Sequence, residues 1–241
     1  MNEQQETVVR ETGLYERLQA LFEVFLLCGI ISSLLAMLPF SLLGISEDDF
    51  LQNPHLLVGS LLLEAFITLA FLIAVLRAHR ESLGQIGLKF INWRADALGG
   101  ILLVPLLFLI NALVSEGIRI YLPHRYIESN PLTEMIKTPE ELALFIVCAV
   151  AVGGIKEELQ RAFIIKRFES HLGGAKLGLV IWSVAFGVGH YMQGFQGVVI
   201  AGLLGFVFGI AFLIRGRLIA PIVAHSIYNT MALLGYWFYT A

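Results

Sequence analysis

The chain has 241 residues, of which 57% are hydrophobic and only 15% charged. Its mean hydropathy of +0.79 is well above what a soluble domain of this size needs to fill a core, so the composition indicates an integral membrane protein in contact with a lipid bilayer. The formal net charge of -3 is small, and the basic residues form no stripe with interleaved aromatic side chains, which excludes nucleic acid as a partner.

The chain starts with a polar stretch that precedes a long apolar run. Residues 1–18 mix four glutamates with only two arginines, Arg10 and Arg17. The apolar run that follows is too long for the hydrophobic part of a cleaved signal peptide. We therefore expect residues 1–18 to form a polar cytoplasmic segment and the run to be an uncleaved membrane anchor.

A helix needs about twenty mostly apolar residues to cross the hydrocarbon core. Candidate segments lie at residues 19–43, 56–78, 96–119, 141–167, 176–193, 196–214 and 217–239. The fourth of them qualifies only if ionisable side chains are allowed inside the membrane. The sequence thus predicts an all-α fold, a polytopic bundle of about seven transmembrane helices.

The placement of lysine and arginine predicts the orientation of these helices. With a cytoplasmic N-terminus, 13 of the 16 lysines and arginines fall on the inner side, and only Arg119, Arg125 and Lys137 lie outside. The opposite orientation would place those 13 outside. We therefore predict a cytoplasmic N-terminus and an external C-terminus, with residues 120–140 as one long external loop. This loop-poor architecture favours a bacterial plasma membrane.

Polar side chains divide the remaining chain into two parts. Residues 19–140 are expected to form the first three transmembrane helices with the external loop. Residues 141–241 are expected to form a four-helix core of catalytic type, because almost all of the intramembrane polar candidates fall there. Charged side chains inside a bilayer are costly enough that they normally face a cavity or a partner and mark function. The candidates are Glu157, Glu158, Arg161, His190, His225 and Asn229.

The depth of these side chains is compatible with a common site. A rise of about 1.5 Å per helical residue, counted from the cations at the inner edge, places Glu157, His190, His225 and Asn229 near the middle of the membrane. The core of a bilayer is about 30 Å thick. The four side chains can therefore meet.

The spacing of these residues suits hydrolysis. Glu157 and Glu158 lie four and three residues before Arg161, so the arginine can neutralise one carboxylate and leave the other free. A free carboxylate beside an imidazole can activate a water molecule, and a second histidine with an asparagine amide can donate to an oxyanion. This set is sufficient for cleaving an acyl bond without a cofactor. The alternative, a zinc ion held by glutamate and two histidines, is less favoured because no His-Glu-x-x-His motif is present.

Three short motifs carry a resemblance to a known family. The stretches "EELQRAFII" at 157–165, "FGVGH" at 186–190 and "HSIYN" at 225–229 resemble the motifs of the CAAX protease and bacteriocin-processing family, also called the ABI family of intramembrane endopeptidases. The resemblance covers about residues 141–232. It implies a membrane hydrolase that cleaves a peptide or protein substrate, lipidated or membrane-anchored in some members, with no cofactor.

The resemblance also implies roles for the individual side chains. Glu157 and His190 would activate water, and His225 and Asn229 would stabilise the tetrahedral oxyanion. The second glutamate of the pair and Arg161 would pair with each other and position the substrate.

The chain departs from the family pattern at one point. The usual motif leaves three residues between the glutamate pair and the arginine, whereas this chain leaves two, Leu159 and Gln160. Aligned on Arg161, Lys156 replaces the first glutamate; aligned on the pair, the arginine comes one residue early. A lysine cannot act as the same base, so we favour Glu157.

Two alternatives from other functional classes stay open. The altered spacing motivates the first, a non-catalytic relative that acts as a membrane interaction or immunity protein. The second is a small proton-coupled transporter that uses the buried carboxylates as a proton site. Its weakness is that the polar cluster occupies only the C-terminal four helices, without the inverted halves of many transporters.

Overall fold

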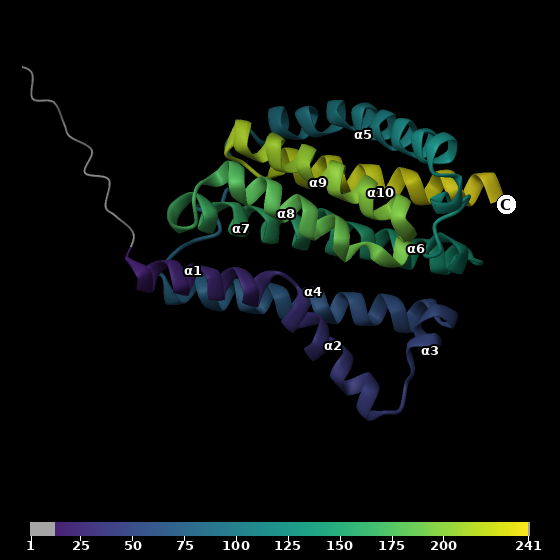
Figure 1. Cartoon of the computed structure of the whole chain (residues 1–241), viewed down its shortest axis with the longest axis horizontal. Coiled ribbons are helices and arrows are strands. Elements are labelled where there is room, and N and C mark those ends of the chain that lie inside the picture. Colours follow the sequence, from purple (N-terminus) through teal and green to yellow (C-terminus); the bar gives the residue numbers. More distant parts are fainter. Residues whose placement is uncertain (1–12, 241) are drawn as a thin grey trace, which may run out of the picture.

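The computed structural model describes residues 13–240, and this part of the chain forms helices joined by turns and loops, without strands (Figure 1). Of the polar segment expected at 1–18, residues 1–12 lie outside the described residues. The helices are α1 (Leu14–Leu27), α2 (Ile30–Leu42), α3 (Glu47–Gln52), α4 (Pro54–Ala78), α5 (Trp93–Tyr121), η1 (Pro123–Arg125), η2 (Thr133–Met135), α6 (Pro139–Cys148), η3 (Ala149–Lys156), α7 (Glu157–His171), α8 (Ala175–Gly189), η4 (Tyr191–Gln193), α9 (Gly194–Arg215) and α10 (Ile219–Thr240).

Four helical segments are long and apolar enough to cross a membrane. They are Leu14–Leu42, Pro54–Ala78, Trp93–Tyr121 and Tyr191–Arg215. The protein is therefore a polytopic helical membrane protein. The segments predicted at 141–167, 176–193 and 217–239 are also helical, but they are shorter or more polar, and their crossing of the bilayer stays a prediction.

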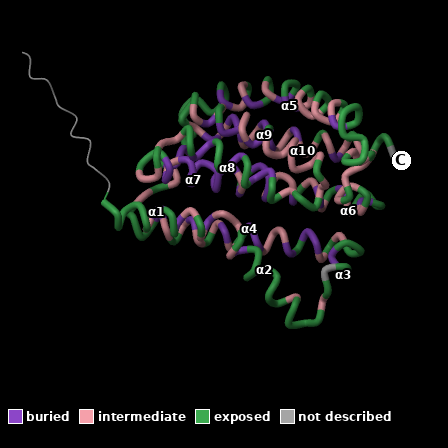
Figure 2. Tube along the Cα trace, viewed as in Figure 1, coloured by how far each residue is buried: buried purple, intermediate pink, exposed green. Residues whose placement is uncertain are grey.

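The span predicted at 19–43 lies within the apolar segment Leu14–Leu42, but it consists of two helices and not of one. The helix is interrupted at Cys28 and Gly29, and Gly29 has a φ of 100°, a conformation that glycine adopts without steric cost. The amide of Gln160 on α7 donates to the backbone carbonyl of Leu27 at 2.5 Å, which satisfies an acceptor at the end of α1. Beyond this break, α2 slants away from the line of α1 (Figure 1) and exposes most of its apolar side chains (Figure 2).

The helix that carries the glutamate pair lies at the centre of the bundle. In Figure 1, α1 and α4 lie on one side of α7 and α5 lies on the other side. The helices α8, α9 and α10 lie between α7 and α5. Contacts join α7 to α1, α8 and α9, and join η3 to α4 and α10. The buried positions accordingly gather on α7 and its neighbours (Figure 2), and Ala162, Phe163, Ile164 and Ile165 are almost completely buried.

The predicted helix at 141–167 belongs to a longer helical stretch whose middle is wider than an α-helix. It starts at a capping box in which Thr138 accepts from the backbone of Glu141 at 3.2 Å, and the Glu141 carboxylate accepts from the backbone of Thr138 at 2.9 Å. After α6, residues Ala149–Lys156 form the π-helix η3, and α7 follows without a break. Short π segments inside α-helices occur frequently at functional sites.

A second boundary differs from the prediction. The helix expected over 176–193 ends at Gly189, so His190 lies in the turn between α8 and η4.

The expected external loop at 120–140 lies between α5 and α6, and it is held against the turn that contains His190. Asn130 donates to Gln193 at 3.1 Å, and the backbone of Ile127 donates to Gln196 at 3.5 Å.

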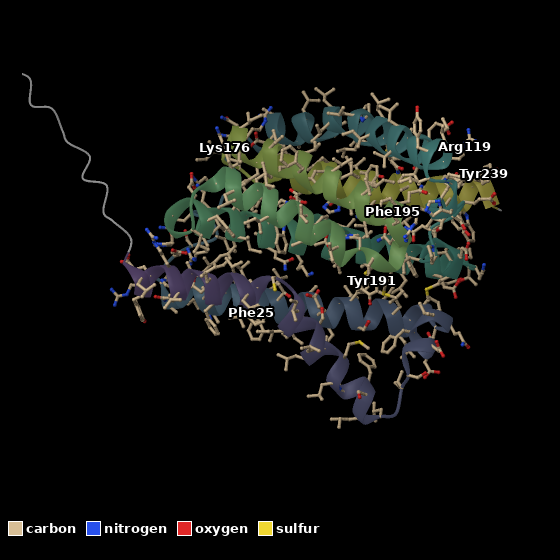
Figure 3. All side chains as sticks on the ribbon, in the orientation of Figure 1. Phe25, Arg119, Lys176, Tyr191, Phe195 and Tyr239 are labelled. Atoms are coloured by element: carbon tan, nitrogen blue, oxygen red, sulfur yellow. The ribbon has the colours of Figure 1, made fainter. Side chains whose placement is uncertain are left out.

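Charged side chains join helices at the predicted cytoplasmic end. Arg167 on α7 bonds to Glu23 on α1 at 2.6 Å and to Glu81 at 2.9 Å. Lys176, predicted to be inside, and Arg119, predicted to be outside, lie at opposite ends of the molecule (Figure 3). The two residues are thus separated as the prediction requires, and which end faces the cytoplasm stays a prediction.

Candidate active site

Glu158 is the centre of a buried polar cluster. Its side chain is 0% exposed, and one carboxylate oxygen accepts from two neighbours. One donor is the guanidinium of Arg161, three residues later on α7, and the other is Nδ1 of His225 on α10, at 2.8 Å. The predicted spacing of Glu158 and Arg161 thus produces a direct pair, and the pair also holds a histidine from a distant part of the chain.

Aromatic rings cover the guanidinium of Arg161. Its central carbon lies 4.6 Å from the ring centre of Phe186 on α8 and 5.5 Å from that of Phe208 on α9. A cation held over ring faces is stabilised electrostatically even where water is excluded. Phe208 also stacks on the His225 ring, with centres 4.6 Å apart. The rings therefore fix both partners of Glu158.

His225 lies between the two carboxylates of the glutamate pair. Its Nδ1 faces Glu158, and its Nε2 lies 3.9 Å from Oε2 of Glu157. That distance is too long for a direct hydrogen bond, and at such a separation a water molecule can bridge two polar groups. The Glu157 side chain is 15% exposed, in contrast to the fully buried Glu158. Glu157 is therefore the more accessible carboxylate of the pair.

Asn229 and His225 both lie against the backbone of η3. They are one turn apart on α10, and a methyl group at Gly153 would lie 2.6 Å from Nδ2 of Asn229 and 3.3 Å from Nε2 of His225. At the next position, a methyl group on Gly154 would overlap the hydroxyl of Ser226. The glycines thus allow α10 to approach closely, and the two predicted oxyanion donors converge beside Gly153, one turn before the glutamate pair.

His190 approaches the same group of side chains through Phe186. Its Nδ1 lies 2.8 Å from the backbone carbonyl of Phe186, and because a carbonyl only accepts, Nδ1 carries the hydrogen. In the neutral ring, Nε2 is then the acceptor. Phe186 packs against both His190 and His225, with ring centres 4.6 and 6.4 Å away. His190 is thus near the cluster, but its recorded hydrogen bond joins it to Phe186 and not to Glu157.

Lys156 points away from this cluster. Its ammonium group forms a buried ion pair with Glu64 on α4, at 2.7 Å. The alignment that puts Lys156 in the place of the first glutamate would therefore replace the base by a side chain directed toward another helix. The first carboxylate beside His225 in this structure is that of Glu157, and its role as the base stays a prediction.

Several residues of the site carried little signal in the sequence. Phe208 lies in an apolar run of α9 where nothing distinguishes it from a packing residue. Glu64 is a lone carboxylate in an apolar helix. A carboxylate in that position indicates a polar partner inside the membrane, and it was the available signal for this contact. Gly153 and Gly154 directly precede the glutamate pair, and a glycine pair at a predicted membrane helix indicates close approach of a neighbour. Within the described residues, no group of three or more histidine, cysteine or acidic side chains is arranged to hold a metal ion.

The fold and the cluster define a polytopic helical membrane protein with a buried glutamate–arginine–histidine site. Residues 139–231 match the model of the type II CAAX prenyl endopeptidase Rce1-like family, so this part of the chain is an Rce1-like domain. No curated protein and no solved structure matched the chain in the same comparisons. The matched range runs from α6 into α10 and contains the six predicted site residues.

Proposed function

We propose that the protein is an intramembrane endopeptidase that hydrolyses a peptide bond with water activated by glutamate and histidine. The observation that carries the proposal is the position of His225 between the two carboxylates of the pair, with Asn229 beside it on the same backbone surface. The Rce1-like family of the domain supports a peptidase over other hydrolases.

In the proposed reaction, Glu157 and His190 activate the water. Glu157 accepts a proton from it while the oxygen attacks the carbonyl carbon of the substrate. The acceptor Nε2 of His190 gives the water a second hydrogen-bond partner. When the tetrahedral intermediate collapses, the carbon–nitrogen bond breaks and the proton passes from Glu157 to the leaving amine. The products are a new carboxylate and a new amine.

His225 and Asn229 stabilise the oxyanion in this scheme. The amide of Asn229 is a donor by nature, whereas His225 donates from Nε2 only when both ring nitrogens carry hydrogens. In this scheme His225 carries hydrogens on both ring nitrogens, with Nδ1 facing Glu158 and Nε2 free to donate to the oxyanion. When Glu157 takes up a proton, it loses its negative charge. The oxyanion that forms beside His225 then carries a negative charge in its place.

Arg161 and Glu158 take supporting roles. Glu158 holds Nδ1 of His225 and thereby orients the ring. Two nitrogens of the Arg161 guanidinium, Nε and Nη2, are buried without a hydrogen-bond partner among the described residues. Because the rings of Phe186 and Phe208 cover the guanidinium, Arg161 would position the substrate indirectly, through Glu158 and His225. The substrate must present its scissile bond inside the membrane. A peptide or protein that is lipidated or membrane-anchored meets that requirement.

We also propose that all of the predicted segments cross the bilayer, about seven in number, with the N-terminus in the cytoplasm of a bacterial cell. Lys176 and Arg119 lie at opposite ends of the molecule (Figure 3), as helices that cross the bilayer require, and the placement of 13 of the 16 lysines and arginines on one side supports a cytoplasmic N-terminus. The proposed organisation keeps residues 19–140 as a supporting unit and residues 141–241 as the catalytic unit.

Comparison of newly formed protein termini tests the proposal. Membrane proteins are profiled for N- and C-termini in cells that carry the wild type, Glu157→Ala, or the control Glu116→Ala, at equal expression. Glu116 is a suitable control because its carboxylate pairs with Arg119 and is half exposed, far along the chain from the site. Termini present with the wild type and the control, and absent with Glu157→Ala, establish proteolysis and name the substrate. Identical profiles in all three, with a phenotype that survives the mutation, favour the non-catalytic relative.

A further inference from the structure

A second buried polar cluster surrounds Glu64 on α4, and its residues other than Lys156 lie outside the matched family range. Its Oε2 binds the ammonium group of Lys156 at 2.7 Å. Its Oε1 lies 2.8 Å from the hydroxyl of Ser32 on α2 and 2.8 Å from the hydroxyl of Thr68 on α4. All four residues are at most 7% exposed. The cluster joins the N-terminal half of the chain to the last residue of η3.

The position of Lys156 gives this ion pair a particular importance. Lys156 ends the π-helix, and Glu157 is the next residue. A π segment contains wider turns than an α-helix, and the extra residue can move along the chain if nothing fixes it. A shift by one residue turns the following side chains by about 100° around the helix axis. Such a turn would carry Glu158 away from Nδ1 of His225.

The two sides of η3 are held in different ways. On the side of α10, Gly153 and Gly154 set how closely the helices approach, but they have no side chains that could fix a rotation. On the side of α4, the pair of Lys156 and Glu64 is a directional contact between buried charges. Breaking such a pair leaves an uncompensated charge in a site without water, which is strongly unfavourable. The ion pair therefore adds a directional restraint on the α4 side to the apolar packing of Val152 in the core.

We propose that Glu64, supported by Ser32 and Thr68, is a positioning residue that holds Lys156 and thereby fixes the rotation at which the glutamate pair meets His225. The effect on cleavage rests on the proposed function, whereas the effect on the geometry of His225 does not. The N-terminal helices then form part of the site's alignment, in addition to anchoring the Rce1-like domain in the membrane.

The test measures the hydrogen bond between His225 and Glu158 directly. Purified protein with ¹⁵N-labelled histidine is reconstituted in lipid nanodiscs, and the Nδ1 signal of His225 is assigned by its loss in His225→Gln. Glu64→Gln preserves the shape of the side chain and removes its charge. We expect this variant to lose the hydrogen-bonded Nδ1 signal and to slow cleavage by at least about 100-fold, since a displacement of only 1 Å at a reacting group can already have that effect. A variant that keeps the wild-type Nδ1 signal overturns the proposal.

Glu23→Gln is the matched control. Glu23 is as deeply buried as Glu64 and also binds a cation, Arg167, at 2.6 Å. Arg167 lies ten residues after Glu157, about 15 Å along the helix. The control should keep the His225 signal even if it lowers thermal stability. Loss of the signal in both variants would indicate a general loosening of the bundle and would also overturn the proposal.

Two further variants decide the case if Glu64→Gln does not fold. The exchanged pair, Glu64→Lys with Lys156→Glu, restores an ion pair and should recover the His225 signal. The apolar pair, Glu64→Leu with Lys156→Met, removes both charges and should fold while lacking the signal. An apolar pair with a normal signal contradicts the proposal. If Glu157→Ala leaves cleavage unchanged, the proposed function fails, and the Nδ1 signal still decides this inference.

Discussion

A single methyl group at Gly153 is expected to disable the site without removing any of its polar side chains. In the substitution Gly153→Ala, the new carbon would lie 2.6 Å from Nδ2 of Asn229 and 3.3 Å from Nε2 of His225, where ordinary contacts begin at 3.4 Å. Asn229 must therefore move by about 0.8 Å or η3 must move back. Because Nδ2 is the end of a side chain, this movement costs little unfolding free energy, but a displacement near 1 Å at a reacting group lowers a rate about 100-fold.

The assay compares Gly153→Ala with Gly59→Ala, a matched control on α4. A methyl group at Gly59 would meet no atom within 4 Å, and alanine stabilises a helix relative to glycine by about 0.5–1 kcal/mol at either position. Both variants are purified, their thermal unfolding is recorded, and their turnover number is measured on the substrate that terminal profiling identifies. We expect the control to keep its activity and Gly153→Ala to lose it. A Gly153→Ala protein with wild-type turnover would refute the convergence of Asn229 and His225 on this backbone.

Three other predictions follow from buried contacts and from the orientation. Glu158→Gln leaves Arg161 without a compensating charge, so the unfolding free energy should fall by about 3–5 kcal/mol in a denaturant titration; an unchanged value contradicts the buried pair. Gln160→Leu leaves the backbone carbonyl at the end of α1 without its donor, which should cost about 1–3 kcal/mol and speed amide exchange around the helix break, whereas unaltered exchange would argue against this contact. In a background without native cysteines, Glu128→Cys should react with a membrane-impermeant maleimide from outside the cell and Lys89→Cys only after lysis, and the reverse pattern would invert the topology.

The apolar runs of the sequence predict most of the helices, because the length that a bilayer requires is a strong constraint. They do not predict the break at Gly29. Hydropathy measures transfer into the membrane and contains no information about the backbone path, and glycine is common in continuous membrane helices. The break depends on Gln160, 131 residues later in the chain, which supplies a donor for the exposed carbonyl.

Helical spacing accounts for part of the candidate site. The three-residue interval between Glu158 and Arg161 predicts their pair, and depth counting predicts that His225 can reach them. The spacing could not show which carboxylate His225 binds, because that depends on the rotation of α7 after the π segment, and π segments have no sequence signature as clear as a helix cap. His190 was predicted inside a helix and lies at its end, since a run of apolar residues and glycine does not mark where α8 stops.

Incorporation of oxygen from water would show whether the protein hydrolyses its substrate. The purified wild type and Glu157→Gln are each incubated with the substrate in water enriched in ¹⁸O, and the new C-terminus is analysed by mass spectrometry after a single turnover. We expect one ¹⁸O atom in the new carboxylate with the wild type, and a rate lowered by about 100-fold or more with Glu157→Gln. Cleavage at an undiminished rate by Glu157→Gln, or a wild-type product without the label, would contradict hydrolysis by glutamate-activated water.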